Sequence, residues 1–168
     1  MALTCGDARR AGEGREGGAV VRQDGDRKFV QVLLVEDDPG DVLMTREALD
    51  DHHVPNELHV VRDGVAALDF LHKRADHEGA PTPDLVLLDL NLPRMPGLDV
   101  LKAVKGDPAL ARIPVIVLTT SDAEDDIVAS YALHANAYVT KPVDFDQFVD
   151  VVRKIDDFFV SVVRLPRR

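Results

Sequence analysis

The chain has 168 residues, of which 45% are apolar and 30% charged, and these values predict one domain with a packed core. Its 30 acidic and 20 basic side chains give a net charge of −10, which disfavours nonspecific binding to nucleic acid or to an anionic membrane. No apolar run is long enough to span a bilayer, and Cys5 is the only cysteine, so an intrachain disulfide is excluded and a cytoplasmic location is expected.

Residues 1–29 differ in composition from the rest of the chain. They contain six glycines among mixed charges and few large apolar side chains, which predicts a disordered tail. The tail would act as a tether or an interaction arm, or would have no role. Residues 30–168 are then expected to form the folded domain, which ends in an extended helix.

Strands and helices alternate along residues 30–168. Short apolar runs predict strands over residues 32–35, 58–61, 85–88, 115–118 and 137–140. The run at 85–88 is too short for a helix and has the composition of a strand buried on both faces. Gly79, Pro81 and Pro83 predict a long loop before it.

Helices are predicted between these strands. The first begins at Asp38-Pro39, which supplies an N-cap and a proline at the first helical position. Val42, Leu43 and Leu49 of this helix are expected to face the core. The remaining helices are predicted to begin near residues 64, 98, 121 and 144.

Five strands that alternate with five helices imply right-handed crossovers and a parallel sheet covered on both faces. The predicted fold class is therefore α/β, a flavodoxin-like doubly wound sheet of five strands in the order 2-1-3-4-5. In that order the carboxyl ends of the first, third, fourth and fifth strands converge. Open α/β sheets bind their ligands at this edge.

The two C-terminal helices carry further signals. Ser121 and Glu124 have capping-box spacing, which predicts that the fourth helix starts there. The fifth helix, over residues 144–163, would be about 30 Å long at 1.5 Å per residue, whereas a five-residue strand covers about 17 Å. Its last turns would overhang the sheet with Phe158, Phe159 and three valines. We expect a second copy of the chain to cover them in a homodimer; packing back onto the same domain is the alternative.

Charged and hydroxyl side chains follow four of the predicted strands at the converging edge. They are Glu36 and Asp37 after the first strand, Asp89 after the third, Thr119 after the fourth and Lys141 after the fifth. Three carboxylates in one pocket repel by roughly 4 kcal/mol per close pair at an effective dielectric near 20, so the cluster needs a cation. Oxygen ligands suit Mg²⁺, and the lack of His or Cys beside them disfavours zinc. The sequence also lacks a glycine-rich phosphate loop, which excludes a P-loop nucleotide hydrolase.

A carboxylate beside a metal ion and a lysine can attack phosphorus and form an aspartyl-phosphate. Asp89 is the candidate nucleophile, Lys141 would neutralise charge on the phosphoryl oxygens, and Thr119 could donate a hydrogen bond to one of them. Taken singly, each side chain has a structural explanation: a solvated turn, a strand-end hydroxyl or a surface lysine. Their coincidence at four strand ends favours the chemical explanation.

These residues resemble the receiver domain of bacterial two-component response regulators, over residues 31–163. The acidic group after the first strand, the Asp after the third, the Thr after the fourth and the Lys-Pro after the fifth all match. The resemblance implies that Asp89 accepts a phosphoryl group from a sensor histidine kinase and that the protein signals by conformational change and protein contact. It implies no enzymatic activity beyond the protein's own phosphorylation and dephosphorylation.

The resemblance also assigns metal ligands around Asp89. Asp37 would bind Mg²⁺ directly, Glu36 mainly through water, and Asn91 through its backbone carbonyl, with Asp89 completing the set. Many members of the family have Asp where Glu36 stands, and Glu, with its longer arm, is a common variant.

The resemblance further implies a switch. Thr119 and Lys141 would contact the phosphoryl group on Asp89. Thr119 would move towards that group, and the strand aromatic Tyr138 would turn inward behind it.

A narrower resemblance is to the single-domain regulators that partner phytochrome-type histidine kinases. It rests on the long loop before the third strand, on the run Leu-Leu-Asp-Leu-Asn-Leu-Pro at 87–93, and on segments 118–121, 129–134 and 162–166. It implies a red-light-sensing kinase as phosphodonor. It also implies a homodimer formed through the fourth helix, the fifth strand and the fifth helix.

Two other functions stay open on the sequence. One is a receiver-like binding module that works without phosphorylation, which predicts unchanged partner binding in Asp89→Asn. The other is a Mg²⁺-dependent phosphohydrolase with an aspartyl-phosphate intermediate, as in haloacid-dehalogenase-type enzymes. Those enzymes carry the nucleophile after the first strand, where Glu36 stands here, and usually a cap domain, which we do not expect in this chain.

Overall fold

The structure is a computed structural model that describes residues 29–50 and 55–158. The predicted disordered tail, except for Phe29, and residues 159–163 of the predicted long helix lie outside the described residues. Within the two described ranges, no helix is long and apolar enough to cross a bilayer.

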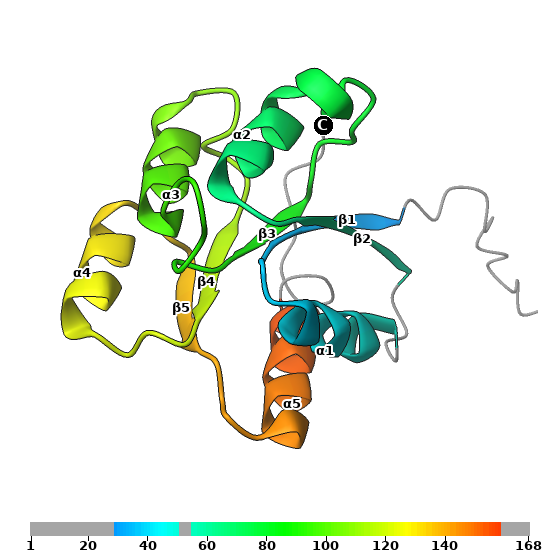
Figure 1. Cartoon of the computed structure of the whole chain (residues 1–168), viewed down its shortest axis with the longest axis vertical. Helices are drawn as coiled ribbons and strands as arrows, with labels where there is room; N and C mark the ends of the chain where they lie inside the picture. Colours follow the sequence, from blue (N-terminus) through cyan, green and yellow to red (C-terminus); the bar gives the residue numbers. More distant parts are fainter. Residues whose placement is uncertain (1–28, 51–54, 159–168) are drawn as a thin grey trace, which may run out of the picture.

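The described residues form one sheet of five parallel strands in the order β2-β1-β3-β4-β5 (Figure 1). The strands are β1 (Val30–Val35), β2 (Asn56–Val61), β3 (Leu85–Leu88), β4 (Val115–Thr119) and β5 (Ala137–Thr140). The order confirms the predicted flavodoxin-like fold, and β1 and β3 are hydrogen-bonded neighbours. Their last residues, Val35 and Leu88, lie opposite each other, so the residues that follow both strands emerge at the same edge.

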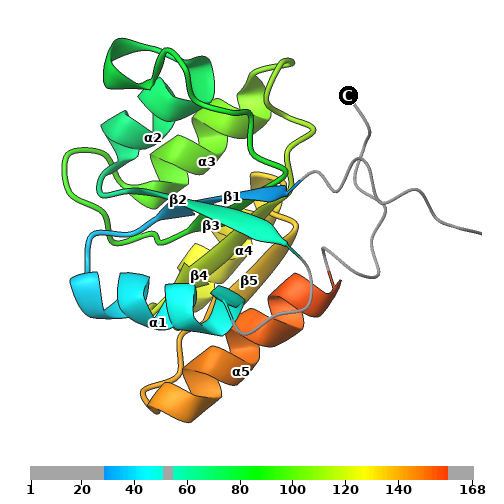
Figure 2. The ribbon, with the colours of Figure 1, turned by 90° about the vertical axis from the view of Figure 1, so that its right-hand side faces the viewer.

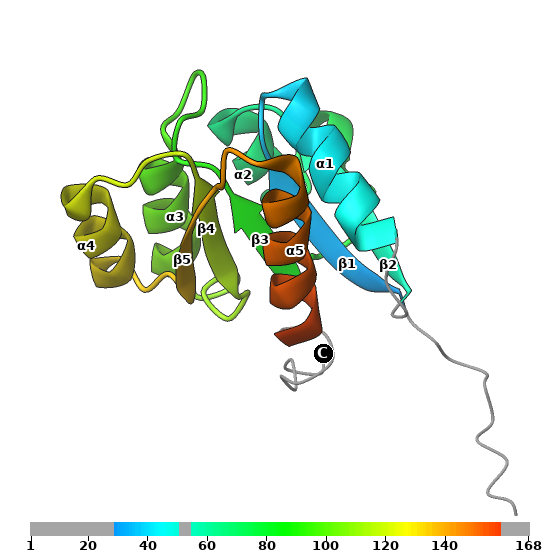
Figure 3. The same cartoon turned by 90° about the horizontal axis from the view of Figure 1, so that it is seen from below.

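In the described ranges, five α-helices cover the sheet. They are α1 (Pro39–Asp50), α2 (Gly64–His72), α3 (Gly97–Gly106), α4 (Glu124–Ala132) and α5 (Phe145–Asp156), and a short 3₁₀ helix, Ala75–His77, lies in the loop before β3. α1 and α5 lie side by side on one face, and α2 and α3 lie on the other (Figures 2 and 3). α4 lies beside α3, next to the edge strand β5 (Figure 1).

Side chains of the inner strands alternate between the two faces. On β1, Leu33 and Val35 pack on the side of α2 and α3, whereas Val32 and Leu34 pack on the side of α1 and α5. The core side chains of β3 and β4 alternate in the same way, and almost all of their surface is buried. Burial on both faces explains why these strands are continuous apolar runs in the sequence.

α1 differs from the prediction in the orientation of one side chain. The buried face of the helix is formed by Thr45 and by Ala48 and Leu49, which follow it by three and four residues. Leu43 lies off this face and is 56% exposed, so its predicted inward orientation is wrong. The outer surface of α1 therefore displays an apolar side chain.

α4 starts later than the capping-box spacing predicts. Ala123 is its N-cap residue, and it offers no side-chain cap. The Ser121 hydroxyl donates to the Asp126 carboxylate, and the Ser121 carbonyl accepts from the Tyr138 hydroxyl. The capping-box prediction is wrong because the Ser121 hydroxyl pairs with Asp126 of α4 and the Ser121 carbonyl pairs with Tyr138 of β5, while Ala123 is the N-cap residue.

Gly97 begins α3 where this helix touches the loop after β3. A Cβ at this position would collide with the Asp89 carbonyl oxygen and the Leu90 Cα. We expect Gly97→Ala to lower the free energy of unfolding by about 2 kcal/mol in urea denaturation, because overpacking forces the two backbones apart. Gly106, at the other end of α3, is the matched control, since a Cβ there meets nothing within 4 Å. Equal stability of the two alanine variants would contradict this packing argument.

Candidate functional site

The Lys141 ammonium is the centre of a buried cluster of charges. Its Nζ lies 2.5 Å from Glu36 Oε2, 2.8 Å from Asp41 Oδ2 and 2.8 Å from Asp89 Oδ2. Lysine has three N–H donors, so each one is used for a different carboxylate. Only 7% of the Lys141 surface is exposed, and this burial strengthens each charge-assisted hydrogen bond.

The alternation of the strands explains why three of these side chains meet. Leu34 of β1, Leu87 of β3 and Val139 of β5 pack on the face covered by α1 and α5. Glu36, Asp89 and Lys141 each follow two residues later, so they continue onto the same face. The structure thus brings together the predicted site residues that end β1, β3 and β5.

Asp41 is a member of the cluster that the sequence reasoning missed. It lies in the first turn of α1, and its carboxylate is 22% exposed. Acidic residues are common there because they suit the helix dipole, so its spacing gave no specific signal. The available signal was topological, since α1 starts three residues after Glu36 and covers the face on which Lys141 lies.

Glu36 and Asp37 are adjacent but have different surroundings. Glu36 is buried, and its second oxygen, Oε1, accepts a hydrogen bond from the Asp38 backbone N–H at 3.0 Å. Asp37 is exposed, and its backbone carbonyl accepts a hydrogen bond from the Arg62 guanidinium at 3.4 Å. Glu36 is therefore part of the buried cluster, whereas Asp37 lies at its rim.

Asp89 has hydrogen-bond donors on several sides. Oδ2 accepts from Lys141, Oδ1 accepts from the Asn91 backbone N–H at 3.1 Å, and the buried Thr119 side chain also hydrogen-bonds the carboxylate. Asn91 itself is exposed. The carboxylate is thus held in one orientation at the end of β3.

The pKa shifts follow from burial and from Lys141. Burial raises the pKa of Asp89, but the hydrogen bonds from Lys141 and Thr119 outweigh it and hold that pKa below its usual value. For Glu36, burial dominates over the hydrogen bond from Lys141, and the pKa is raised. Burial opposes the charged form of Lys141, but its carboxylate partners outweigh this and raise the pKa of its ammonium. Asp89 is therefore an ionised carboxylate at neutral pH, as a nucleophile has to be.

Thr119 and Tyr138 lie towards the other side of the sheet. Tyr138 is half-buried and packs against the α2 and α3 core, and its hydroxyl donates to the Ser121 carbonyl at 2.9 Å. Burial raises the pKa of the Tyr138 hydroxyl. Thr119 hydrogen-bonds Asp89, and its Oγ1 accepts from the Ser121 backbone N–H at 3.4 Å. A chain of contacts thus leads from Asp89 to the β4–α4 loop.

The site offers an all-oxygen donor set to a cation. In the described part of the chain, no three His, Cys, Asp or Glu side chains form a ready-made metal cluster. Glu36 and Asp89 point at Lys141 instead, and Asp37 is exposed. Mg²⁺ usually takes only one or two carboxylates and keeps several waters. Glu36, Asp37, Asp89 and the Asn91 carbonyl therefore fit such an ion without forming a complete cage.

The fold and the site together define a response regulator receiver domain. A family model with that description matches residues 32–153, and the chain belongs to this family. The receiver resemblance seen in the sequence is therefore confirmed.

Individual relatives narrow the comparison. The chain is 45% identical to response regulator Rcp1 of Synechocystis sp. over 135 residues. The aligned region covers 80% of this chain and 92% of Rcp1. The structure of this chain is similar to that of the phosphorylated cyanobacterial phytochrome response regulator RcpA. The TM-score is 0.81, the identity is 44%, and the match covers 83% of this chain and 100% of RcpA. It is also similar to the Mn²⁺-bound form of Rcp1, with a TM-score of 0.79, 44% identity, and coverage of 82% and 99%.

Lys141 is expected to be essential for stability when no metal ion is present. We expect Lys141→Met to lower the free energy of unfolding at neutral pH by about 3 kcal/mol, because it leaves buried carboxylates without a cation. Without the ammonium the already raised pKa of Glu36 rises further and burial raises the pKa of Asp89 above its unfolded value, so the folded variant binds protons more readily than the unfolded chain. The deficit relative to the wild type should therefore narrow as the pH falls from about 7 to about 5, measured by urea denaturation in chelator.

Lys105→Met is the matched control for this measurement. The half-buried Lys105 ammonium donates to the Ala111 and Ile113 carbonyls and to the Asn136 side-chain oxygen, all of which are neutral. Loss of this ammonium leaves no carboxylate unpaired. The decrease in the free energy of unfolding caused by Lys105→Met should therefore stay constant over the same pH range. A Lys141→Met deficit that is equally insensitive to pH would contradict the electrostatic account.

Proposed function

We propose that this protein is a phospho-accepting response regulator in which Asp89 takes a phosphoryl group from a sensor histidine kinase in a Mg²⁺-dependent reaction. The observation that carries the proposal is the buried, ionised Asp89 carboxylate with the Lys141 ammonium 2.8 Å from its Oδ2. A nucleophilic carboxylate and a fixed cation are the two components that phosphoryl transfer requires of the protein.

The transfer can be written for the side chains of this chain. An oxygen of Asp89 bonds to phosphorus while the bond from phosphorus to the donor histidine nitrogen breaks, and that nitrogen keeps the electron pair. The Lys141 ammonium offsets the negative charge on the phosphoryl oxygens, and the Thr119 hydroxyl donates a hydrogen bond to one of them. The ligands proposed for Mg²⁺ are Glu36, Asp37, Asp89 and the Asn91 carbonyl. When bound, the ion supplies further positive charge to the same oxygens.

Signalling is proposed to run through Thr119 and Tyr138. Thr119 already contacts the Asp89 carboxylate, and Tyr138 already contacts the Ser121 carbonyl in the next loop. A phosphoryl group on Asp89 would draw the Thr119 hydroxyl, shift this loop and change the position of Tyr138. This would alter the surface formed by α4 and β5, which is where we place the output.

The partners proposed follow from the relatives. RcpA is a phytochrome response regulator, and a bacteriophytochrome response regulator, RtBRR, is 42% identical to this chain with a TM-score of 0.66 and coverage of 83% of this chain and 85% of that one. We therefore propose a phytochrome-type histidine kinase as phosphodonor in the cytoplasm. Nucleic acid and membrane are not proposed as partners, given the net charge of −10.

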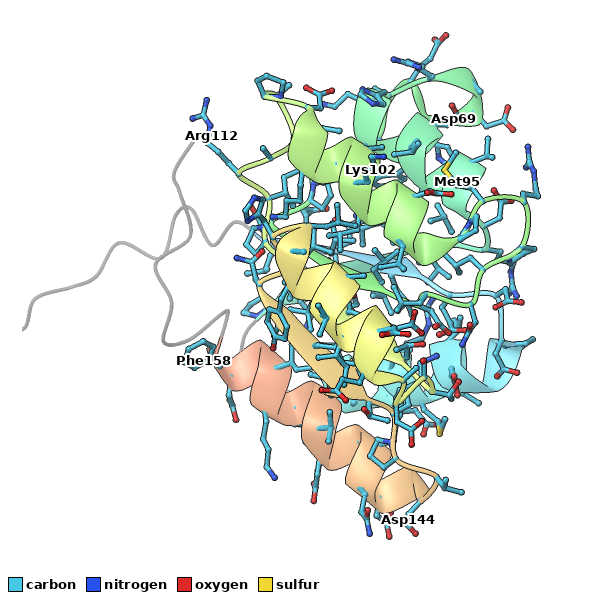
Figure 4. All side chains as sticks on the ribbon, turned by 90° about the vertical axis from the view of Figure 1, so that its left-hand side faces the viewer. Asp69, Met95, Lys102, Arg112, Asp144 and Phe158 are labelled. Carbon is cyan, nitrogen blue, oxygen red and sulfur yellow. The ribbon has the colours of Figure 1, made fainter. Side chains whose placement is uncertain are left out.

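A homodimer through α4, β5 and α5 is the second part of the proposal. β5 is an edge strand, and α4 beside it displays Val128 and Tyr131, which are 61% and 51% exposed. Figure 4 shows α4 and α5 on either side of β5, with Phe158 just past the C-terminal end of α5. Phe158 is 54% exposed. Exposed apolar side chains on α4 and just past α5, on either side of an edge strand, suit a second copy of the chain.

Phosphorylation is tested with a small donor. On incubation with Mg²⁺ and acetyl phosphate, we expect wild-type protein to gain the mass of one phosphoryl group, measured by intact mass spectrometry. Asp89→Asn should gain nothing, because its amide is not nucleophilic. A mass gain in both proteins would show that a residue other than Asp89 accepts the phosphoryl group.

Two results would favour the other functions. No mass gain from acetyl phosphate or from a phosphorylated phytochrome-type kinase, together with unchanged partner binding in Asp89→Asn, would favour a phosphorylation-independent binding module. Sustained release of phosphate from an added phosphate ester would favour a phosphohydrolase.

The dimer surface is tested by a charge on α4. We expect Val128→Asp to shift the protein from dimer to monomer, measured by light scattering after size exclusion, because it places a carboxylate in an apolar contact. Leu43→Asp is the matched control, since Leu43 is 56% exposed but lies on α1. A dimer that survives in Val128→Asp, or dissociates equally in Leu43→Asp, would contradict an interface through α4.

A further inference from the structure

We propose that Asp41 is the positioning residue for Lys141: it holds the ammonium over Asp89 while the other two carboxylates of the cluster change partners. The inference rests on the proposed phosphorylation of Asp89. It concerns a contact that the sequence did not predict, the 2.8 Å ion pair between Asp41 Oδ2 and Lys141 Nζ.

The three carboxylates around Lys141 have different roles in the proposed reaction. Asp89 becomes the acceptor, so its charge is lost from the carboxylate when the phosphoryl group is attached. Glu36 belongs to the proposed metal set, so its oxygens are shared with a cation. Asp41 lies on α1, outside both sets, and its contact with Lys141 can persist throughout.

A persistent partner matters because of the geometry of lysine. Its ammonium is carried on a flexible four-carbon stem, and it has no fixed orientation without a hydrogen-bond acceptor. With Asp41 in place, one N–H stays anchored and the remaining donors are free to follow the charge that develops on the phosphoryl oxygens. Holding a charged group in place before the reaction is a recognised source of rate.

The backbone of Asp41 is itself held firmly. Its N–H donates to Asp38 Oδ1 at 2.9 Å, and its carbonyl accepts from the Thr45 hydroxyl at 2.8 Å. The helix it belongs to packs against α5, the helix that follows Lys141. The ion pair therefore connects Lys141 to a fixed element on its own face of the sheet.

The competing explanation is that Asp41 only stabilises the start of α1. Asp146 provides the matched control, since it is an exposed acidic residue in the first turn of α5. Asp41→Asn and Asp146→Asn each remove one negative charge from a helix N-terminus. Loss of the favourable interaction with the helix dipole should lower the stability of both variants similarly. Only Asp41→Asn should also change the hydrogen bonding of the Lys141 ammonium.

The first experiment measures aspartyl-phosphate formation from acetyl phosphate as a function of Mg²⁺ concentration. We expect Asp41→Asn to lower the maximal rate by about tenfold, with the half-saturating Mg²⁺ concentration unchanged and with Asp41→Glu recovering part of the rate. Asp146→Asn should behave as the wild type. A normal maximal rate, or a defect that high Mg²⁺ removes, would overturn the positioning role. No phosphorylation of wild-type protein would instead defeat the proposed function.

The second experiment asks whether Asp41 acts through Lys141. In a Lys141→Met background, adding Asp41→Asn should leave the residual rate unchanged, because the group it positions is absent. In metal-free protein, the Lys141 ammonium protons should exchange with water faster in Asp41→Asn than in Asp146→Asn, observed by NMR. Additive rate effects, or equal exchange in the two variants, would show that Asp41 does not position Lys141.

Discussion

The interaction on which the site depends is the placement of one buried ammonium among three carboxylates, two of them buried and the third partly exposed. Lys141 balances only one of the three negative charges that Glu36, Asp41 and Asp89 bring. Buried ion pairs of this kind contribute little net stability compared with apolar packing, because removing charges from water costs nearly as much as their attraction returns. Under the proposed function, the cluster is therefore better understood as an arrangement for the reaction of Asp89. It keeps Asp89 ionised and oriented, and its uncompensated negative charge attracts a divalent cation.

The alternation of the strands divides the site into two halves. Glu36, Asp89 and Lys141 continue the face packed by α1 and α5, whereas Tyr138 belongs to the opposite core beside α2 and α3. Asp89 is the connection, because its carboxylate contacts Lys141 on one side and Thr119 on the other. Under the proposed function, the chemistry occupies the first half and the response the second. Phosphorylation of Asp89 would then change its contacts in both halves at once, which is the simplest physical basis for coupling the chemistry to the response.

The sequence predicted the parts of this arrangement that follow from periodicity and topology. The buried strand runs, the strand order and the convergence of Glu36, Asp89, Thr119 and Lys141 all result from how parallel sheets are built. Leu43, Ser121 and Asp41 were different, because each has an ordinary local explanation: an apolar helix residue, a capping box and a helix-dipole charge. Which explanation holds depends on the neighbouring elements, α5 and β5, which are far away in the sequence. Local patterns therefore predicted the scaffold and the ends of its strands, but not the contacts that cross between helices and loops.

α1 and α4 bury different amounts of surface against the sheet, and under the proposed function this difference would set the direction of the response. α1 buries Thr45, Ala48 and Leu49, packs beside α5 and is joined to Lys141 through Asp41. α4 buries only Ser130, whose hydroxyl finds no hydrogen-bond partner among the described residues, and the helix starts without a side-chain cap. An unpaired buried hydroxyl costs about 1–3 kcal/mol, so α4 gives up little when it moves. A change at Asp89 would thus be absorbed by α4 rather than by α1. Because Val128 and Tyr131 lie on α4, the proposed dimer surface would change with it, and by reciprocity dimer formation would in turn favour one state of Asp89.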